Sequence, residues 1–260
     1  MFRTAVIASG SKGNSIFIQS EHAGILLDAG ISTSRVMDFL DRNKLPRTAI
    51  HAIMVSHEHG DHVKGIGSIA RKTGKPIYIT RPTYHACAKA LGKVPYVEFF
   101  SPGDDFIIGD LIVHAFSASH DSVDGCNFTI QQRNNDSAKL AVATDLGFSS
   151  KVTINRLQDV TTLILESNHD EQMLMEGPYP WKLKQRVKSS LGHLSNDQAV
   201  GVIIQVLHKN LHNLILAHLS ETNNKPEIAE AKMREYLSQV RHELNLIIAA
   251  QDQPTQFIDI

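Results

Sequence analysis

The chain has 260 residues, of which 42% are hydrophobic and 20% charged, and its formal net charge is −1. This is the composition of an ordinary globular protein, and it excludes a disordered or collagen-like chain. The near-neutral charge gives no whole-chain argument for nucleic-acid binding, although a local basic groove is not excluded.

The first part of the chain alternates short apolar runs with helical patterns. Strands are predicted at Phe2–Ala8, Ser15–Gln19, Gly24–Leu27, Ala52–Val55 and Pro76–Ile79, and helices at Ser32–Lys44, Asp61–Thr73 and Pro82–Leu91. Glycine- and proline-containing turns separate these segments. The order of strands followed by helices indicates sheet-and-helix layers.

The second part repeats this order. Strands are predicted at Phe106–Ile108, Leu111–Ala118, Asn127–Gln131, Leu140–Ala143, Thr162–Leu165 and Leu214–Ala217, and helices at Ser195–His208 and Pro226–Val240. Ser195 and Gln198 have the spacing of a capping box at the start of a helix. The apolar stripe of this helix is expected at Ala199, Val200, Ile203, Ile204 and Leu207.

Two sheets packed face to face with helices outside would bury all of these apolar faces. We therefore predict an α+β fold, a four-layer αββα sandwich in which two mixed sheets carry helices on both outer faces. No linker, low-complexity tract or fixed-period repeat divides the chain, so residues 1–260 are expected to form a single domain.

The cysteine content and the chain start bear on where the protein works. Cys87 and Cys126 form no Cys-x-x-Cys pair, which argues against a disulfide scaffold and a Cys-based zinc finger. The N-terminal apolar run is too short for a signal-peptide core, and no stretch approaches the about 18 apolar residues of a membrane helix. We expect a cytoplasmic protein without a membrane partner.

Histidines are abundant, with 14 in the chain, and three of them stand together after the strand Ala52–Val55, in Ser56-His57-Glu58-His59-Gly60-Asp61-His62. Imidazole and carboxylate ligands suit zinc, manganese or iron. Residues i and i+2 of an extended segment point the same way, so His57 and His59 can reach one ion. Asp61 and His62, at the turn into the next helix, can face a second ion.

This arrangement resembles the metallo-β-lactamase superfamily, and the resemblance covers the whole chain. The further motifs that carry it are Leu26-Leu27-Asp28-Ala29-Gly30, Ser117-Ala118-Ser119-His120-Asp121, Ala143-Thr144-Asp145-Leu146-Gly147 and Leu216-Ala217-His218-Leu219-Ser220. The resemblance implies the metallo-β-lactamase fold with two divalent ions per chain, zinc or manganese, with iron also possible. It assigns His57, His59 and His120 to the first ion. It assigns Asp61, His62 and His218 to the second, with Asp145 joining both, and gives Asp28 the role of orienting the histidine loop.

Further segments are similar to the nuclease branch of the superfamily, which includes the ribonuclease Z and ribonuclease J types. They are Ser9-Gly10-Ser11-Lys12-Gly13-Asn14, Glu166-Ser167-Asn168-His169-Asp170, Gly192-His193-Leu194-Ser195-Asn196 and His218-Leu219-Ser220-Glu221-Thr222-Asn223-Asn224. In combination they most resemble the YycJ/WalJ type of compact nuclease. That resemblance implies a metal-dependent phosphodiesterase, a 5′-to-3′ exonuclease on DNA rather than RNA. The stretch between Asp145 and His218 is filled by predicted elements, so an inserted clamp domain of the ribonuclease J type is not expected.

The same resemblance assigns catalytic roles. Glu166 is expected to steer His193, which would give a proton to the leaving oxygen. Asp61 is expected to orient the attacking water and take its proton.

Substrate contacts are expected from Ser11, Asn14, His169, Lys182, Lys184 and Asn223. The basic run Trp181–Lys188 has four positive charges and no negative one, which fits a rim that tracks phosphates, with Trp181 stacking on a base. A solvated helix face explains the same run, and both interpretations stay open.

Two other functions use the same residues. A thioester or lactone hydrolase of the glyoxalase II type would need the same ions but no His193–Glu166 pair, because a thiolate leaves without a proton. A metal-dependent module that binds nucleic acid without cutting it would hold ions and substrate but show no turnover.

Overall fold

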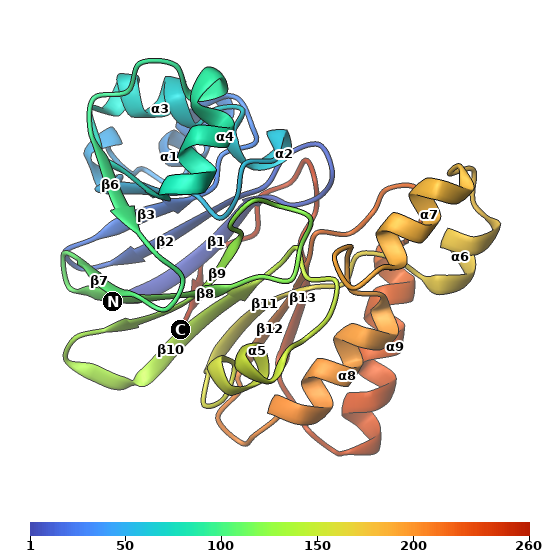
Figure 1. Ribbon diagram of the computed structural model, residues 1–260. Coiled ribbons are helices and arrows are strands. Elements are labelled where there is room, and N and C mark those ends of the chain that lie inside the picture. The colour runs from blue at the N-terminus through green and yellow to red at the C-terminus, as the bar shows by residue number, and fades with distance from the viewer.

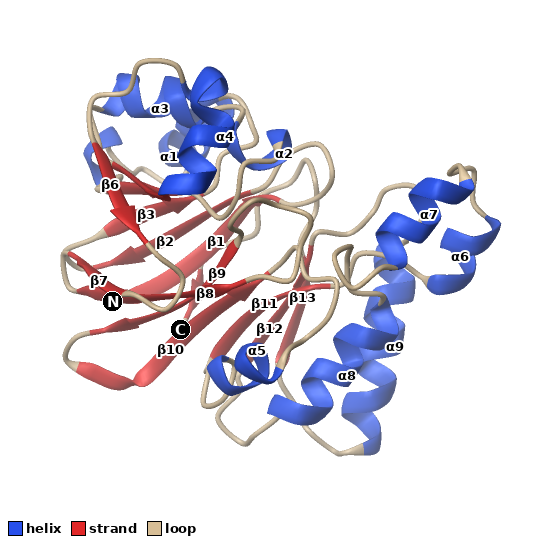
Figure 2. Cartoon of the chain, in the orientation of Figure 1, coloured by secondary structure: helices blue, strands red, loops and turns tan.

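The computed structural model describes residues 1–260, apart from the side chain of Asp136, as two seven-stranded sheets between outer layers of helices (Figures 1 and 2). The predicted four-layer sandwich is thereby confirmed. The two sheets enclose one apolar core, and each has a second core on its outer face beneath its helices.

The first sheet contains the N-terminal strands. In spatial order these are β14 (Ile258–Asp259), β1 (Phe2–Ala8), β2 (Ser15–Ser20), β3 (Gly24–Leu27), β4 (Ala52–Met54), β5 (Ile77–Thr80) and β6 (Val97–Phe100). The pairs from β14 to β3 are antiparallel and those from β3 to β6 are parallel. The sheet is mixed, as predicted.

The second sheet has the same mixed character. In spatial order its strands are β13 (Asn245–Ile248), β12 (Asn213–Ala217), β11 (Thr162–Glu166), β10 (Asn135–Ala143), β9 (Cys126–Gln132), β8 (Leu111–Ser117) and β7 (Asp105–Ile108). The pairs from β10 to β13 are parallel, so these strands share one carboxyl edge, where ligands collect in sheets of this kind.

The helices fall into three groups (Figure 1). One group covers the first sheet: α1 (Thr33–Arg42), the 3₁₀ turn Arg47–Ala49, α2 (Gly60–Val63), α3 (Ile66–Thr73) and α4 (Arg81–Leu91). A second group covers the second sheet: α5 (Lys151–Arg156), α8 (Asn196–Val206) and α9 (Pro226–Gln239). The third group, α6 (Glu171–Glu176) and α7 (Trp181–Lys188), projects from the body on the right of the view.

The helix predicted over Asp61–Thr73 is in fact two helices, α2 and α3. The break falls at Gly65, whose backbone N donates to the carbonyl of Ala29 at 2.7 Å. A Cβ at this position would lie 2.1 Å from the carbonyl oxygen of Ile31. The close approach of the loop after β3 interrupts the helix, and the apolar periodicity carries no sign of it.

The predicted stripe of α8 is partly wrong. The capping box of Ser195 and Gln198 is present, but Ile204 is 57% exposed, and Val202 and Val206 are buried instead. Among the described residues no helix is long and apolar enough to cross a membrane.

Candidate metal centre

The seven predicted metal ligands lie together at one end of the two sheets. His57, His59, Asp61 and His62 follow β4, His120 follows β8, and Asp145 and His218 follow β10 and β12. His57, His62, His120, Asp145 and His218 are buried, and His59 and Asp61 are partly exposed. Strands of both sheets therefore deliver their side chains to one cluster.

His57, His59 and His120 form the first group, with one nitrogen of each ring within 4.8 Å of the others. The Nδ1 atom of His120 donates to the carbonyl of Gly192 at 3.0 Å. The hydroxyl of Ser56 donates to Asp28, so the Nδ1 atom of His57 donates to that hydroxyl at 2.9 Å. These bonds fix the tautomers, so the Nε2 atoms of His57 and His120 carry lone pairs that could bind an ion. His57 Nε2 has no hydrogen-bond partner among the described residues, and His120 Nε2 lies 3.2 Å from His59 Nδ1.

Asp61, His62 and His218 form the second group. Asp61 Oδ2 lies 3.5 Å from the Nε2 atoms of both His62 and His218. Asp145 lies between the two groups, with Oδ2 3.4 Å from His62 Nε2 and Oδ1 3.8 Å from His120 Nε2. A carboxylate in this position can share its oxygens between two ions.

The cluster fits divalent ions. His57 Nε2, His218 Nε2 and Asp145 Oδ2 are buried and have no hydrogen-bond partner within the described part of the chain. Buried polar atoms are almost always paired, because an unpaired one costs about 1–3 kcal/mol. Ligands about 2.0–2.2 Å from a tetrahedral ion lie roughly 3.4 Å apart, which is near the separations measured here.

Two carboxylates orient the histidines without belonging to the proposed ligand set. Asp28 accepts hydrogen bonds from the backbone N of Ser56 at 2.8 Å and from His62 Nδ1 at 2.8 Å. Glu166 Oε1 accepts from His193 Nδ1 at 2.7 Å and from His218 Nδ1 at 3.0 Å. Partners of this kind hold the imidazole Nε2 atoms toward a metal.

The charges in the cluster balance one another. Burial alone would lower the pKa of His218, but the carboxylates of Asp145, Asp61 and Glu166 raise it to about 10. Burial alone would raise the pKa of Glu166, but the imidazoles of His193 and His218 hold it at about 2. Without divalent ions, a proton on His218 therefore offsets part of the carboxylate charge, and a bound ion would replace this proton.

Three residues of the site have left-handed backbone conformations. Each has a φ angle of 56°: Asp28, Asp145 and His218. Asp28 and His218 directly follow β3 and β12, and Thr144 alone separates Asp145 from β10. Residues other than glycine seldom adopt this region, and such strain persists mainly at functional sites. The sharp turn lets each side chain face the cluster as the chain leaves its sheet.

Gly30 sets the position of Asp61. A Cβ on Gly30 would lie 1.6 Å from the carbonyl oxygen of Asp61, which itself accepts from the backbone N of Asn14 at 2.8 Å. We expect the Gly30→Ala protein to lose about 3 kcal/mol of its free energy of unfolding, measured by urea denaturation, because neither backbone segment can move freely. It should also bind less divalent metal.

The Gly201→Ala protein is the control, because no atom lies within 4 Å of the corresponding Cβ position in α8. It is expected to unfold at the wild-type urea concentration or slightly above it. Wild-type stability and metal content in the Gly30→Ala protein would contradict the proposed packing.

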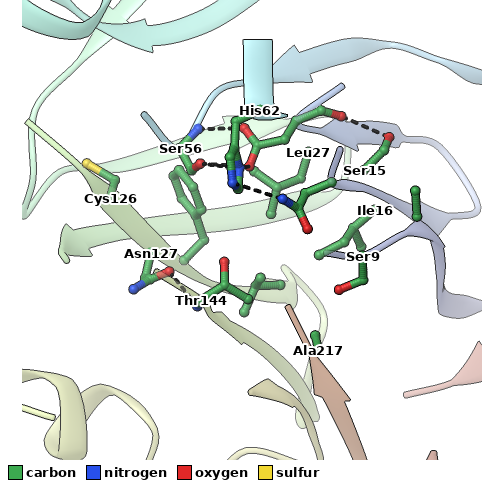
Figure 3. A pocket seen from close by; sticks show the side chains of 15 residues that line it. Ser9, Ser15, Ile16, Leu27, Ser56, His62, Cys126, Asn127, Thr144 and Ala217 are labelled. Carbon is green, nitrogen blue, oxygen red and sulfur yellow. Dashed lines mark hydrogen bonds and ion pairs between the residues drawn. The ribbon is translucent and has the colours of Figure 1, made fainter. Parts of the chain in front are cut away.

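A small internal cavity of about 10 Å³ lies behind the cluster, between the sheets. Figure 3 shows Ser56 and His62 on one side of it and Asn127 and Thr144 on the other. Asn127 accepts from the backbone N of Thr144 at 3.0 Å, which fixes the turn before Asp145. This volume is about that of one water molecule, so the interior behind the loops that carry the proposed ligands is closely packed.

An open pocket of about 240 Å³ lies in front of the cluster. His59, Asp61, Asp145, His193 and His218 form its floor and inner side. The outer wall comes from the α6–α7 region, where the lining residues are Tyr179, Leu183, Arg186 and Val187. The pocket gives a ligand direct access to the proposed metal ligands.

The six predicted substrate-binding residues have different surroundings. Ser11 lines the pocket. Asn14 is buried, and its Nδ2 lies 3.3 Å from Asp61 Oδ2 and 3.0 Å from His62 Nε2, so it contacts the proposed ligands. His169 and Asn223 are each 1% exposed. Lys182 and Lys184 stand on α7, where Lys184 Nζ donates to the carbonyl of Met175 at 2.6 Å. Substrate contact by these residues stays a prediction.

Six residues that line the pocket were not predicted from the sequence as site residues: Asn168, Tyr179, Leu183, Arg186, Val187 and Ser220. Arg186 lies within the basic run that was predicted, but nothing in that run distinguishes it from its neighbours. The direction in which α7 leaves the body decides which side chain faces the pocket.

Comparisons with known proteins give relatives over nearly the whole chain. The sequence pattern of the beta-lactamase superfamily domain matches residues 24–219. The exodeoxyribonuclease YycJ of Bacillus anthracis is 34% identical over 237 residues, which are 90% of this chain and 89% of the relative. The exodeoxyribonuclease WalJ of Streptococcus pneumoniae is 34% identical over 243 residues, which are 92% of this chain and 89% of the relative.

Among solved structures, the metallo-β-lactamase fold protein YhfI of Bacillus subtilis is similar, with a TM-score of 0.70 and 18% identity. The match covers 98% of this chain and 100% of that protein. At this level of identity the similarity concerns the fold.

Proposed function

The chain belongs to the metallo-β-lactamase superfamily, in its YycJ/WalJ group, and we propose that it is a metal-dependent phosphodiesterase that degrades DNA from a 5′ end. The two curated relatives are named exodeoxyribonucleases, which supports DNA over RNA as the substrate. The observation that carries the proposal is His193, whose Nδ1 is held by Glu166 at 2.7 Å while the ring lines the metal pocket.

The proposed cofactor is a pair of divalent ions, zinc or manganese, with iron as a further candidate. His57, His59 and His120 would hold one ion, Asp61, His62 and His218 the other, and Asp145 would share its oxygens between them. When bound, the ions supply a water acidic enough to react at neutral pH and offset the charge on the phosphoryl oxygens.

The side chains around the ions supply the proton transfers. The pKa of Asp61 is held well below its usual range because His218 and His62 outweigh the effect of burial, so its carboxylate is ionised. It can orient the attacking water and accept its proton. His193 Nε2 can give a proton to the leaving oxygen, because Glu166 occupies Nδ1.

The alternative functions place different demands on this geometry. A thioester hydrolase has no use for a proton donor at His193, since a thiolate is a good leaving group. A module that only binds nucleic acid has no use for a pocket histidine that a buried carboxylate holds through Nδ1. The Glu166–His193 pair therefore favours cleavage of a phosphodiester.

Three parts of the proposal rest on the sequence. They are the organisation of residues 1–260 as one metallo-β-lactamase domain without an inserted clamp domain, the cytoplasmic location and the 5′-to-3′ polarity. Each stays a prediction.

We expect the protein to release nucleotides from linear DNA at least about tenfold faster than it nicks closed circular DNA of the same sequence, with Mn²⁺ present. The reason is the pocket of about 240 Å³, which residues of α7 and the proposed metal ligands line together, because an exonuclease would place one strand end in such a pocket. End-labelled linear DNA and supercoiled plasmid, incubated in parallel and separated on gels, provide the measurement. Equal rates on both forms would contradict the exonuclease proposal.

A further inference from the structure

Arg186 is a cation on the α7 wall of the pocket to which the proposed mechanism assigns no role. Its Nη2 donates to Asp121 Oδ1 at 3.0 Å, and its Nε donates to Asp121 Oδ2. Its Nη1 makes no hydrogen bond to the residues that the structure describes. A guanidinium has five N–H donors, so this pairing leaves donors free on the side away from Asp121.

Asp121 holds this guanidinium from the loop that follows β8. Its backbone N donates to the carbonyl of Leu191 at 3.0 Å, and it directly follows the proposed ligand His120. Both oxygens of its carboxylate accept from the guanidinium of Arg186. The pair therefore connects α7 to a loop of the metal centre.

Two other cations of α7 have partners outside the pocket. Lys184 Nζ donates to Met175, and Lys188 Nζ lies 3.4 Å from Glu171 Oε2. Among the described residues, Arg186 is the only cation of α7 that lines the pocket. Arg186 lines this pocket together with the proposed metal ligands Asp61, Asp145 and His218.

We propose that Arg186 binds, through its free N–H groups, the phosphate next to the scissile phosphate of a nucleic-acid strand. This inference rests on the proposed function. In the proposed mechanism the scissile phosphate contacts the metal centre and His193. The adjacent phosphate of the strand would lie farther along the α7 side of the pocket, where Arg186 is the available cation. Tyr179 and Leu183 line the same wall and offer apolar surface to the intervening sugar and base.

The two hydrogen bonds to Asp121 orient the guanidinium of Arg186 before nucleic acid binds. Less side-chain conformational entropy is therefore lost on binding. A lysine in the same place would supply charge without this fixed direction.

The test compares a substrate that has neighbouring phosphates with one that has a single phosphate. In the Arg186→Gln protein, KM for a single-stranded oligonucleotide should rise about tenfold with little change in kcat, as expected for one lost charge-assisted contact. Hydrolysis of bis(p-nitrophenyl) phosphate, which has one phosphate only, should stay at the wild-type rate.

Equilibrium binding gives a second readout. The logarithm of oligonucleotide affinity falls linearly with the logarithm of salt concentration, and the slope of this line should drop by about 0.7 in the Arg186→Gln protein. Fluorescence anisotropy with the metal-loaded His193→Ala protein, in which cleavage is slow, measures this slope. The control is Arg234→Gln on α9, which breaks an exposed Arg–Glu pair with Glu230 and should leave KM and the slope unchanged.

The Asp121→Asn variant separates phosphate binding from a role in holding α7 in place. It keeps the charge of Arg186, so the salt slope should stay at the wild-type value. The inference is overturned if both variants lose activity equally on the oligonucleotide and on bis(p-nitrophenyl) phosphate. The Arg186–Asp121 pair would then serve only the packing of α7.

Failure of the proposed function would look different. A wild-type protein that cleaves no DNA overturns that function. Oligonucleotide binding then tests Arg186 separately. If the dependence of affinity on salt concentration is unchanged in the Arg186→Gln protein, Arg186 does not bind a phosphate.

Discussion

The His59→Ala protein is expected to bind one divalent ion fewer per chain than the wild type and to hydrolyse DNA at least about 10³-fold more slowly. His59 Nδ1 lies 3.2 Å from His120 Nε2, a separation that two ligands of one ion would have. A catalytic ion contributes several kcal/mol to the transition state, which corresponds to this factor. Elemental analysis of purified protein and initial rates on end-labelled DNA provide the two measurements.

His218 allows the same test on the second ion. Because its φ is 56°, His218→Asn is a better variant than His218→Ala, since asparagine tolerates this region. The control is His212→Ala, which removes an exposed histidine just before β12, whereas His218 directly follows that strand. Two full equivalents of metal in the His218→Asn protein would remove His218 from the ligand set.

The His193→Ala protein is expected to cleave natural DNA at least about 10²-fold more slowly, the usual contribution of a general acid. An alkoxide leaving group needs a proton as its bond breaks, whereas a nitrophenolate does not. The rate on a p-nitrophenyl phosphodiester should therefore stay within a few-fold of the wild type. The metal content should not change, because His193 is not among the proposed ligands.

Glu166 is a poorer target for this question. Besides His193 and His218, its side chain accepts from the backbone N atoms of Leu146 and Leu194, so Glu166→Gln would disturb the metal centre as well as the proton donor. Equal losses on both substrates in His193→Ala would mean that His193 positions the phosphate or a metal. No loss on either would leave it a structural residue at the entry to α8.

Most residues of the candidate metal centre could be proposed from the sequence, and found together in the structure, because they stand in short, strongly patterned segments. The run from His57 to His62 follows a buried strand, and Asp145 and His218 end apolar runs of their own. Strand ends are where the chain must turn, so a histidine or aspartate there is conspicuous in the sequence. The layers of the fold followed from the same periodicity.

The α7 wall could not be predicted in the same way. Its four cations look alike in sequence, and the contact that distinguishes Arg186 comes from Asp121, 65 residues away in the chain. The break between α2 and α3 and the exposed Ile204 of α8 have the same cause. Each depends on which distant backbone or side chain packs against the element, and a periodic pattern carries no information about that.

The most direct test of the account is a metal titration. Chelator-treated protein receives increasing amounts of Mn²⁺ or Zn²⁺, and the release of nucleotides from end-labelled linear DNA is measured at each step. The account predicts no release without metal and a rate that rises until two ions are bound per chain. Full release in the presence of chelator, or no release at any metal content, would contradict it.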